Sequence, residues 1–133
     1  MKKLLVTLIC LFCCTFAYSE TQWFNSDSYA YKTIDYYGNW NKWSSWNNCD
    51  VDIKFDTNAD MIIIYSNKVQ IYKITNYNGT KQEKDGSQQA YFSAIDYDGD
   101  KCTIRLRIET NGNSQIYVEF SNVMWVYNVV RIS

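Results

Sequence analysis

The sequence predicts an all-β domain: an antiparallel meander of eight strands that forms a small barrel or a flattened barrel-sandwich. Three observations lead to this fold class. Apolar and polar residues alternate with a period of two over much of the chain, turn-forming residues separate the alternating segments, and the second half of the chain repeats the first. We find no convincing amphipathic-helix period, so the expected domain contains strands alone.

Residues 1–19 have the features of a secretory signal peptide. Two lysines follow the initiating methionine, and residues 4–16 form an apolar run that is too short to span a membrane. Small residues at the next suitable positions favour cleavage before Glu20. We therefore expect an exported protein, periplasmic or extracellular, with a single domain over residues 20–133.

The alternation is clearest in two segments that both begin with cysteine, "CDVDIKF" (49–55) and "CTIRLRIE" (102–109). Each is typical of a strand with one buried and one wet face. Further strands rich in Ile, Val, Tyr and Phe are predicted over 61–66, 69–76, 88–96, 114–121 and 123–132. Turn signals separate them at Thr57-Asn58, Ser66-Asn67, Asp98-Gly99 and Asn111-Gly112. The predicted inward set includes Val51, Ile53, Phe55, Ile104, Leu106, Ile108, Val118 and Phe120.

The two halves of the chain align over three blocks. The first block matches "YAYKTIDYYGN" with "AYFSAIDYDGD", the second "CDVDIKFDTN" with "CTIRLRIETN", and the third "YSNKVQIYKI" with "FSNVMWVYNV". Ten aligned positions are identical. The alignment predicts one four-strand repeat over about 29–76 and a second over about 88–132, with 77–87 as a polar linker.

Three of the five tryptophans lie in "WNKWSSW", residues 40–46. The first half has eight residues between its turn glycine and its cysteine that the second half lacks, so 40–47 is an insertion at the tip of one hairpin. Insertions into the loops of a rigid scaffold commonly carry function. We therefore name three candidate ligand-binding residues: Trp40, Trp43 and Trp46. Alternatively, these side chains fold back and plug one end of a barrel.

Cys49 and Cys102 are the cysteines that remain once the signal peptide is removed, and they begin equivalent strands. In an exported protein such a pair predicts a disulfide. In a round eight-stranded meander the two cysteines would lie opposite one another, whereas a bond needs Cα atoms within about 7 Å. The predicted Cys49–Cys102 bond therefore implies a flattened barrel.

Composition excludes several functions. Without the signal peptide the chain has 11 basic and 14 acidic residues, a net charge of −3, and no basic patch, which argues against nucleic acid or an anionic membrane as partner. No second apolar run is long enough to span a membrane. The chain has no histidine, so Ser–His and Cys–His nucleophiles and histidine metal sites are excluded. We expect no cofactor and no metal site.

The acidic segment "DYDGD" (96–100) resembles the start of a calcium loop. The helix-loop-helix calcium pattern requires Gly at its sixth position and Glu at its twelfth, where this chain has Lys101 and Arg107. Asp35 and Asp96 occupy equivalent positions before turns, where an aspartate caps backbone amides. A carboxylate enzyme would need two acids that meet in a cleft. We expect a non-catalytic binding module whose partner is a protein, a glycan or a small apolar ligand.

The sequence also resembles two known groups of proteins. "GNW" (38–40) followed by a meander resembles the G-x-W motif of lipocalins, with Arg131 on the last strand in the place of that tryptophan's usual partner. This resemblance implies a carrier of a small apolar ligand as the second candidate function. The chain also resembles, in general character, small exported β-proteins of unknown function from Gram-negative gut bacteria, which implies no activity.

Overall fold

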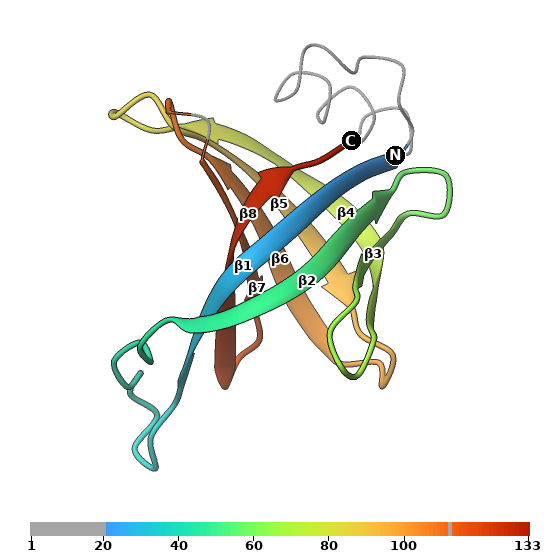
Figure 1. Cartoon of the computed structure of the whole chain (residues 1–133). Coiled ribbons are helices and arrows are strands. Elements are labelled where there is room, and N and C mark those ends of the chain that lie inside the picture. Colours follow the sequence, from blue (N-terminus) through green and yellow to red (C-terminus); the bar gives the residue numbers. More distant parts are fainter. Residues whose placement is uncertain (1–20, 112) are drawn as a thin grey trace.

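The computed structural model describes residues 21–111 and 113–133, which form eight antiparallel strands (Figure 1). Each strand pairs with its neighbours in the chain, and β1 pairs with β8, so the sheet closes into a barrel. The predicted fold class is confirmed, as a closed barrel. The strands are β1 (Thr21–Thr33), β2 (Asn47–Asp56), β3 (Met61–Ile64), β4 (Gln70–Gln82), β5 (Gln88–Ile95), β6 (Lys101–Ile108), β7 (Ser114–Glu119) and β8 (Val123–Arg131).

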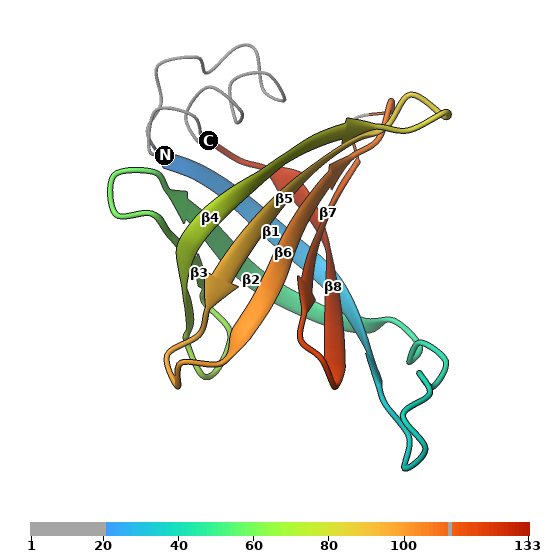
Figure 2. The ribbon, with the colours of Figure 1, turned by 180° about the vertical axis from the view of Figure 1, so that it is seen from behind.

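The barrel has two different ends (Figures 1 and 2). At one end, called the loop end below, lie the four turns 34–46, 65–69, 96–100 and 120–122. The start of β1 and the end of β8 lie at the opposite end, together with the remaining three turns. The predicted signal peptide and Gly112 of the predicted Asn111-Gly112 turn lie outside the described residues.

Alternation along the strands produces the core. Phe24, Phe55 and Phe92 meet edge to face within it, with centroid distances of 5.5 Å from Phe24 to Phe55 and 6.2 Å from Phe55 to Phe92. An eight-stranded barrel is just wide enough for its inward side chains to fill it, and these rings do so. The predicted inward set is confirmed: six of its eight members are in the buried cluster, and Ile108 and Phe120 pack against it.

The turns that follow β1 and β5 have the same geometry, as the repeat alignment requires. The side chain of Asp35 accepts hydrogen bonds from the second and fourth residues that follow it, each at 2.9 Å, and Asp96 does the same at 2.9 and 2.8 Å. Gly38 and Gly99 have φ angles of +84° and +85°, in the left-handed region that favours glycine. Both aspartates are therefore turn caps.

The alignment needs one adjustment at the third strand of each half. Extending the third block back by one residue would match Ile64 in β3, which is fully buried, with Glu119 in β7, which is half-buried and bonded to Arg105 outside the core. Val118, one residue earlier, is the buried counterpart of Ile64. The two halves therefore differ by one residue between their third and fourth strands.

Two boundaries differ from the sequence-based prediction. β1 begins at Thr21 rather than near residue 29, because Gln22 and Ser26 are buried polar residues that hide the period of two. The predicted linker 77–87 is largely strand, since β4 continues to Gln82. Register shifts near Asn76 and Gly79 bend β4, and its exposed polar end pairs with β5 beyond the core.

We expect Phe55→Ala to lower the free energy of unfolding by about 3–5 kcal/mol, because it removes a fully buried ring. Tyr97→Ala is the control, since Tyr97 is 87% exposed and its loss should change stability by less than about 0.5 kcal/mol. Urea unfolding of both variants measures the difference. Equal effects would contradict a core centred on these rings.

Candidate binding surface at the loop end

The Trp loop, residues 40–46, runs back beside the last residues of β1. The backbone N–H of Asn41 donates to the carbonyl of Thr33 at 2.8 Å, and that of Ser44 donates to the carbonyl of Tyr31 at 2.7 Å. The hydroxyl of Ser44 also accepts from the backbone N–H of Tyr31 at 3.0 Å. The loop therefore forms the irregular return arm of a long hairpin, whereas the insertion was predicted at a hairpin tip.

Two tryptophans of the loop face a lysine on the outer wall of β1. The Lys32 ammonium lies 5.4 Å from the ring centroid of Trp40 and 4.7 Å from that of Trp43. The Trp43 ring in turn meets Tyr117 of β7 edge to face, with centroids 6.4 Å apart. Each exposed cation–π contact is worth about 0.5–1 kcal/mol. These ring contacts therefore hold the loop against the barrel.

Tyr117 also contacts Arg105 of β6, whose guanidinium carbon lies 3.7 Å from the Tyr117 ring centroid. Arg105 also pairs with Glu119 at 3.3 Å and donates to Gln89 at 2.7 Å. Because these partners fix the guanidinium, the tyrosine ring between it and Trp43 is held from both sides.

A small apolar group lies on the outer wall beside Tyr117, the tyrosine that Trp43 meets. Ala30 and Val126 are 2% and 3% exposed, yet neither belongs to the interior cluster. Val126 pairs with Ala30 on one side and Tyr117 on the other, so the three side chains lie side by side on the outside of β1, β8 and β7. The Trp loop follows β1 beside Tyr31, and Trp43 meets the Tyr117 ring of this group.

The three predicted ligand-binding residues do not plug the barrel. None belongs to the interior cluster, and Trp40, Trp43 and Trp46 are 37%, 40% and 52% exposed. Trp46 has no ring contact among the described residues. The tryptophans therefore differ in their contacts: Trp40 and Trp43 have ring contacts with Lys32 or Tyr117, and Trp46 is the most exposed of the three.

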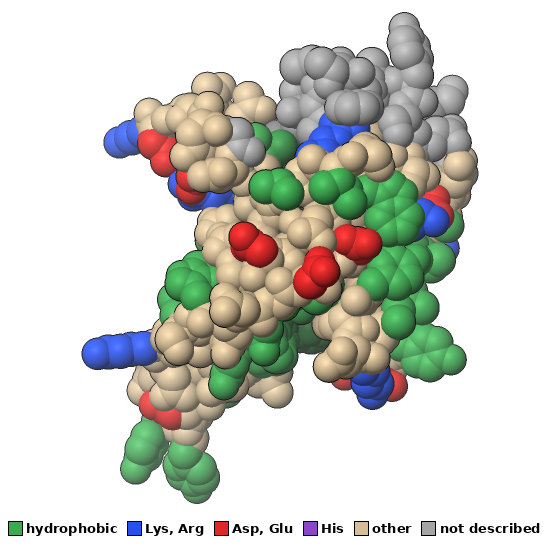
Figure 3. All heavy atoms as spheres, in the orientation of Figure 1, with side chains coloured by type: hydrophobic (Ala, Val, Ile, Leu, Met, Phe, Trp, Pro, Cys, Tyr) green, Lys and Arg blue, Asp and Glu red, His purple; other side chains and the backbone are tan. Residues whose placement is uncertain are grey.

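Further aromatic side chains project from the same end. Tyr36 and Tyr37 at the tip of the long hairpin are 97% and 84% exposed, and Tyr97 occupies the equivalent turn. Hydrophobic side chains stand out at the tip of the loop that follows β1 in Figure 3. The tyrosines extend the exposed aromatic surface beyond the Trp loop.

A second aromatic group, the mouth cluster, lines the inside of the barrel at the loop end. It consists of Tyr29, Tyr31, Trp125 and Tyr127. Trp125 lies 6.1 Å from Tyr29 and 5.3 Å from Tyr31, and Tyr29 lies 6.1 Å from Tyr127, with rings tilted by 37–44°. A register shift between Ser26 and Ser28 turns the tyrosines of β1 inward.

Gln70 of β4 organises the polar groups of the mouth. Its Nε2 donates to the hydroxyl of Tyr127 at 3.3 Å and to that of Ser66 at 3.0 Å, and its Oε1 accepts from Tyr72 at 2.5 Å. Burial raises the pKa of both tyrosine hydroxyls. Both therefore stay protonated at neutral pH.

The predicted Cys49–Cys102 disulfide is wrong. Both cysteines are free thiols, on β2 and β6, which lie four strands apart in a ring of eight. The sheet closes into a barrel in which these strands form opposite walls. Cys49 donates to the carbonyl of Ser26 at 3.5 Å, and burial, followed by the Asp96 carboxylate, raises the pKa of the Cys102 thiol to about 12.

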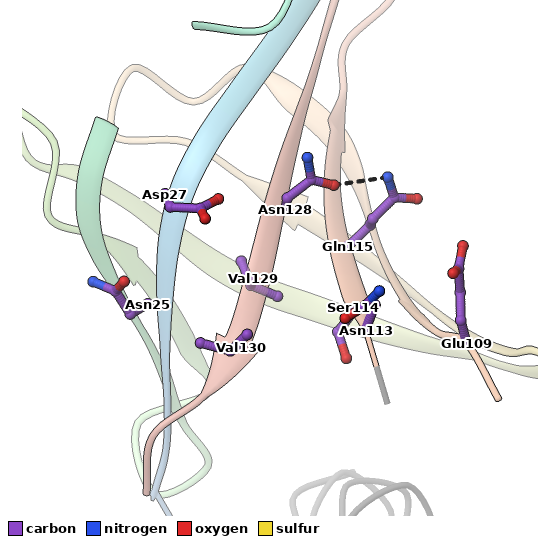
Figure 4. A pocket seen from close by; sticks show the side chains of 9 residues that line it. All are labelled: Asn25, Asp27, Glu109, Asn113, Ser114, Gln115, Asn128, Val129 and Val130. Atoms are coloured by element: carbon purple, nitrogen blue, oxygen red, sulfur yellow. Dashed lines mark hydrogen bonds between the residues drawn. The ribbon is translucent and has the colours of Figure 1, made fainter. Parts of the chain in front are cut away.

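A polar pocket of about 340 Å³ lies on the outer wall of β1, β8 and β7 (Figure 4). Its two acids, Asp27 and Glu109, lie at opposite sides of it, and Gln115 and Asn128 between them bond to each other at 3.0 Å. The acids are three strand spacings apart, about 14 Å along the sheet at about 4.8 Å each. Paired glycosidase acids lie within about 9.5 Å, so this pair lacks that geometry.

The "DYDGD" segment forms the capped turn described above. Among residues 21–111 and 113–133, no group of three or more acidic, cysteine or histidine side chains is placed to hold a metal ion. A search of the same residues finds no helix with the length and apolarity needed to cross a membrane. Trp40 of the G-x-W motif and Arg131 lie at opposite ends of the barrel, because Arg131 pairs with Phe24.

A scan against protein-family models, a search of curated proteins and a search of solved structures each find no match to this chain. Its function therefore has to be inferred from its own residues.

The sequence did not predict the partners that position the aromatic groups, namely Lys32, Tyr117 and Gln70, nor did it predict the mouth cluster. The spacing Tyr29-x-Tyr31 and Trp125-x-Tyr127 places each pair on one face of a strand, which is a signal that could have found the cluster. The contacts of Lys32 and Tyr117 with the loop depend on tertiary structure and have no local pattern.

We expect both thiols to be alkylated by iodoacetamide in urea without any reductant, giving two adducts by intact mass. In the native protein at pH 8, Cys102 should react far more slowly than Cys49, because the thiolate is the nucleophile and burial keeps the Cys102 thiol protonated. Reductant-treated protein is the control. Adducts that form only after reduction would show that the two cysteines are joined by a disulfide.

We expect Trp43→Ala to lower the free energy of unfolding by about 2 kcal/mol, which is less than the loss for a fully buried ring because Trp43 is partly exposed. Trp46→Ala should change it by less than about 0.5 kcal/mol. Urea unfolding of the two variants compares them. A Trp46 variant as unstable as the Trp43 variant would show that the whole loop is structural.

Proposed function

We propose that this chain is a non-catalytic, exported binding module, periplasmic or extracellular, and that Trp40, Trp43 and Trp46 contact its ligand. The observation that carries the proposal is the exposure of these rings on a loop whose backbone is bonded to β1. Tryptophan is enriched among the residues that contribute most to binding at protein interfaces. Three rings at 37–52% exposure leave a large aromatic area in water.

The loop is also preorganised for binding. Its hydrogen bonds to Thr33 and Tyr31 and the Lys32 contacts fix it before any ligand arrives. A fixed loop loses little conformational entropy when it binds, and this favours affinity. The second half of the barrel closes the equivalent hairpin directly, from Ile95 to Lys101, so the fold itself does not require such a loop.

The second candidate, a lipocalin-like carrier of a small apolar ligand, would need a hollow apolar interior. Fully buried side chains, among them Phe55, Ile104 and Val118, occupy the interior below the mouth. The binding module is therefore the function that this geometry favours.

The test measures binding of the purified protein to arrays of immobilised glycans and of immobilised proteins. We expect the double variant Trp40→Ala/Trp46→Ala to bind its target at least about tenfold more weakly than the parent, because it removes most of the exposed ring area. Trp23→Phe is the matched control outside the loop. Unchanged binding by the double variant, with its unfolding midpoint preserved, would exclude the Trp loop as the contact surface.

A further inference from the structure

β2 has an open edge at the loop end. β3 has only four residues and pairs with Ile53–Asp56, so the part of β2 before Ile53 pairs with β1 alone. The backbone N–H of Tyr65, donating to the carbonyl of Asp52 at 2.9 Å, marks where the two strands separate. The wall of the barrel is therefore open beside residues 48–51, close to the turn 65–69.

A pocket of about 440 Å³ occupies this opening. Pockets for small ligands usually measure about 300–1,000 Å³. Its floor includes Tyr29, Trp125 and Tyr127 of the mouth cluster, and its rim is formed by β2 and by the turn after β3. The pocket is thus a side entrance to the aromatic mouth of the barrel, and the Trp loop does not line it.

Most of the uncharged polar groups around this floor are amides and hydroxyls. The rim contributes Asn48 and Asn67, which both have exposed side chains, together with Ser66 and Gln70. Val51 is the only aliphatic residue among those that line the pocket. Such a lining favours a ligand that combines an apolar face with many hydroxyl groups over a purely apolar one.

Two hydrogen-bond donors in the floor of the pocket have no acceptor among the described residues. The Tyr127 hydroxyl accepts from Gln70, so its own proton remains for a ligand, and burial keeps that proton in place by raising the pKa of the hydroxyl. The indole N–H of Trp125 has no acceptor within the described part of the chain, although its ring is held between Tyr29 and Tyr31. Both donors belong to fixed rings.

The residues that line the pocket carry no net charge. Lys68 and Asp50 are its charged residues, of opposite sign, and an oxygen of Asp50 already accepts from Asn25 at 2.8 Å. A pocket without net charge gives no preference for an ionic ligand. We propose that this side pocket is a binding site for a neutral saccharide, whose C–H face packs on the mouth cluster while its hydroxyls bond to Tyr127, Trp125 and Asn48.

The inference shares with the proposed function the premise that the protein binds a ligand, and it adds a second site and a ligand class. An extended peptide is the competing occupant, because the open edge of β2 could pair with one. The saccharide is favoured because the exposed rim supplies amide side chains rather than the apolar pockets that hold peptide side chains.

The test uses full-length mature protein labelled with fluorotryptophan and observed by fluorine NMR. The chain has five tryptophans, and single Trp→Phe variants assign their signals. Cellotriose, maltotriose, xylotriose and triacetylchitotriose are titrated separately, alongside an acetylated Val-Thr-Val-Thr-Val peptide and Nile red. We expect at least one saccharide to shift the Trp125 signal while the Trp46 signal stays unchanged.

Tyr127→Phe should weaken saccharide binding about tenfold, because the ring remains but the free donor is lost, together with the acceptor of the Gln70 hydrogen bond. Tyr117→Phe is the matched control on the outer wall and should bind as the parent does. Asn48→Ala, a substitution of an exposed side chain, should also weaken binding without any change in the unfolding midpoint. It keeps the test decisive if Tyr127→Phe destabilises the barrel.

Three outcomes overturn the inference. If none of the saccharides shifts the Trp125 signal, the pocket is not a saccharide site. If the peptide or Nile red shifts it and the saccharides do not, the ligand class is wrong. If saccharides shift only the signals of Trp40, Trp43 or Trp46, the proposed function stands and the mouth is not the site.

Discussion

The pairing of β1 with β8 is the constraint on which the rest of the structure depends. It removes the free edges that a meander would leave, and it fixes the width of the interior that the buried rings fill. The same pairing determines which side chains point where, because the register shift between Ser26 and Ser28 lies on β1. Before the shift Phe24 faces the core, and after it Tyr29 and Tyr31 face the mouth.

The long β1 therefore serves both aromatic groups at the loop end. Its last residues alternate between Tyr29 and Tyr31 on the inside and Ala30 and Lys32 on the outside. The backbone of Tyr31 holds the Trp loop through Ser44, while its ring packs on Trp125. The two surfaces share one strand, so a displacement of β1 at one would be felt at the other.

The sequence predicted what depends on local pattern. Seven of the eight strands and the inward residues follow from alternation and turn signals, and the repeat located the capped turns at Asp35 and Asp96. The sequence did not predict the start of β1, because Gln22 and Ser26 are polar residues that the barrel buries. The prediction of the disulfide was wrong because it depends on the distance between strands across the barrel, which the pattern of residues along a strand does not determine. The side pocket depends on a different strand length in one half, and this too is visible only in the folded chain.

The open edge of β2 has a consequence for the protein in concentrated solution. An unpaired strand edge can accept a strand from another copy of the chain, which is a route to aggregation. Asp50 and Asp52 lie along this edge, and Asn25 holds both carboxylates, at 2.8 and 3.0 Å. A second copy that approached with the same edge would bring two further aspartates toward them. The mutual repulsion of these carboxylates opposes such pairing and leaves the opening to smaller, uncharged molecules.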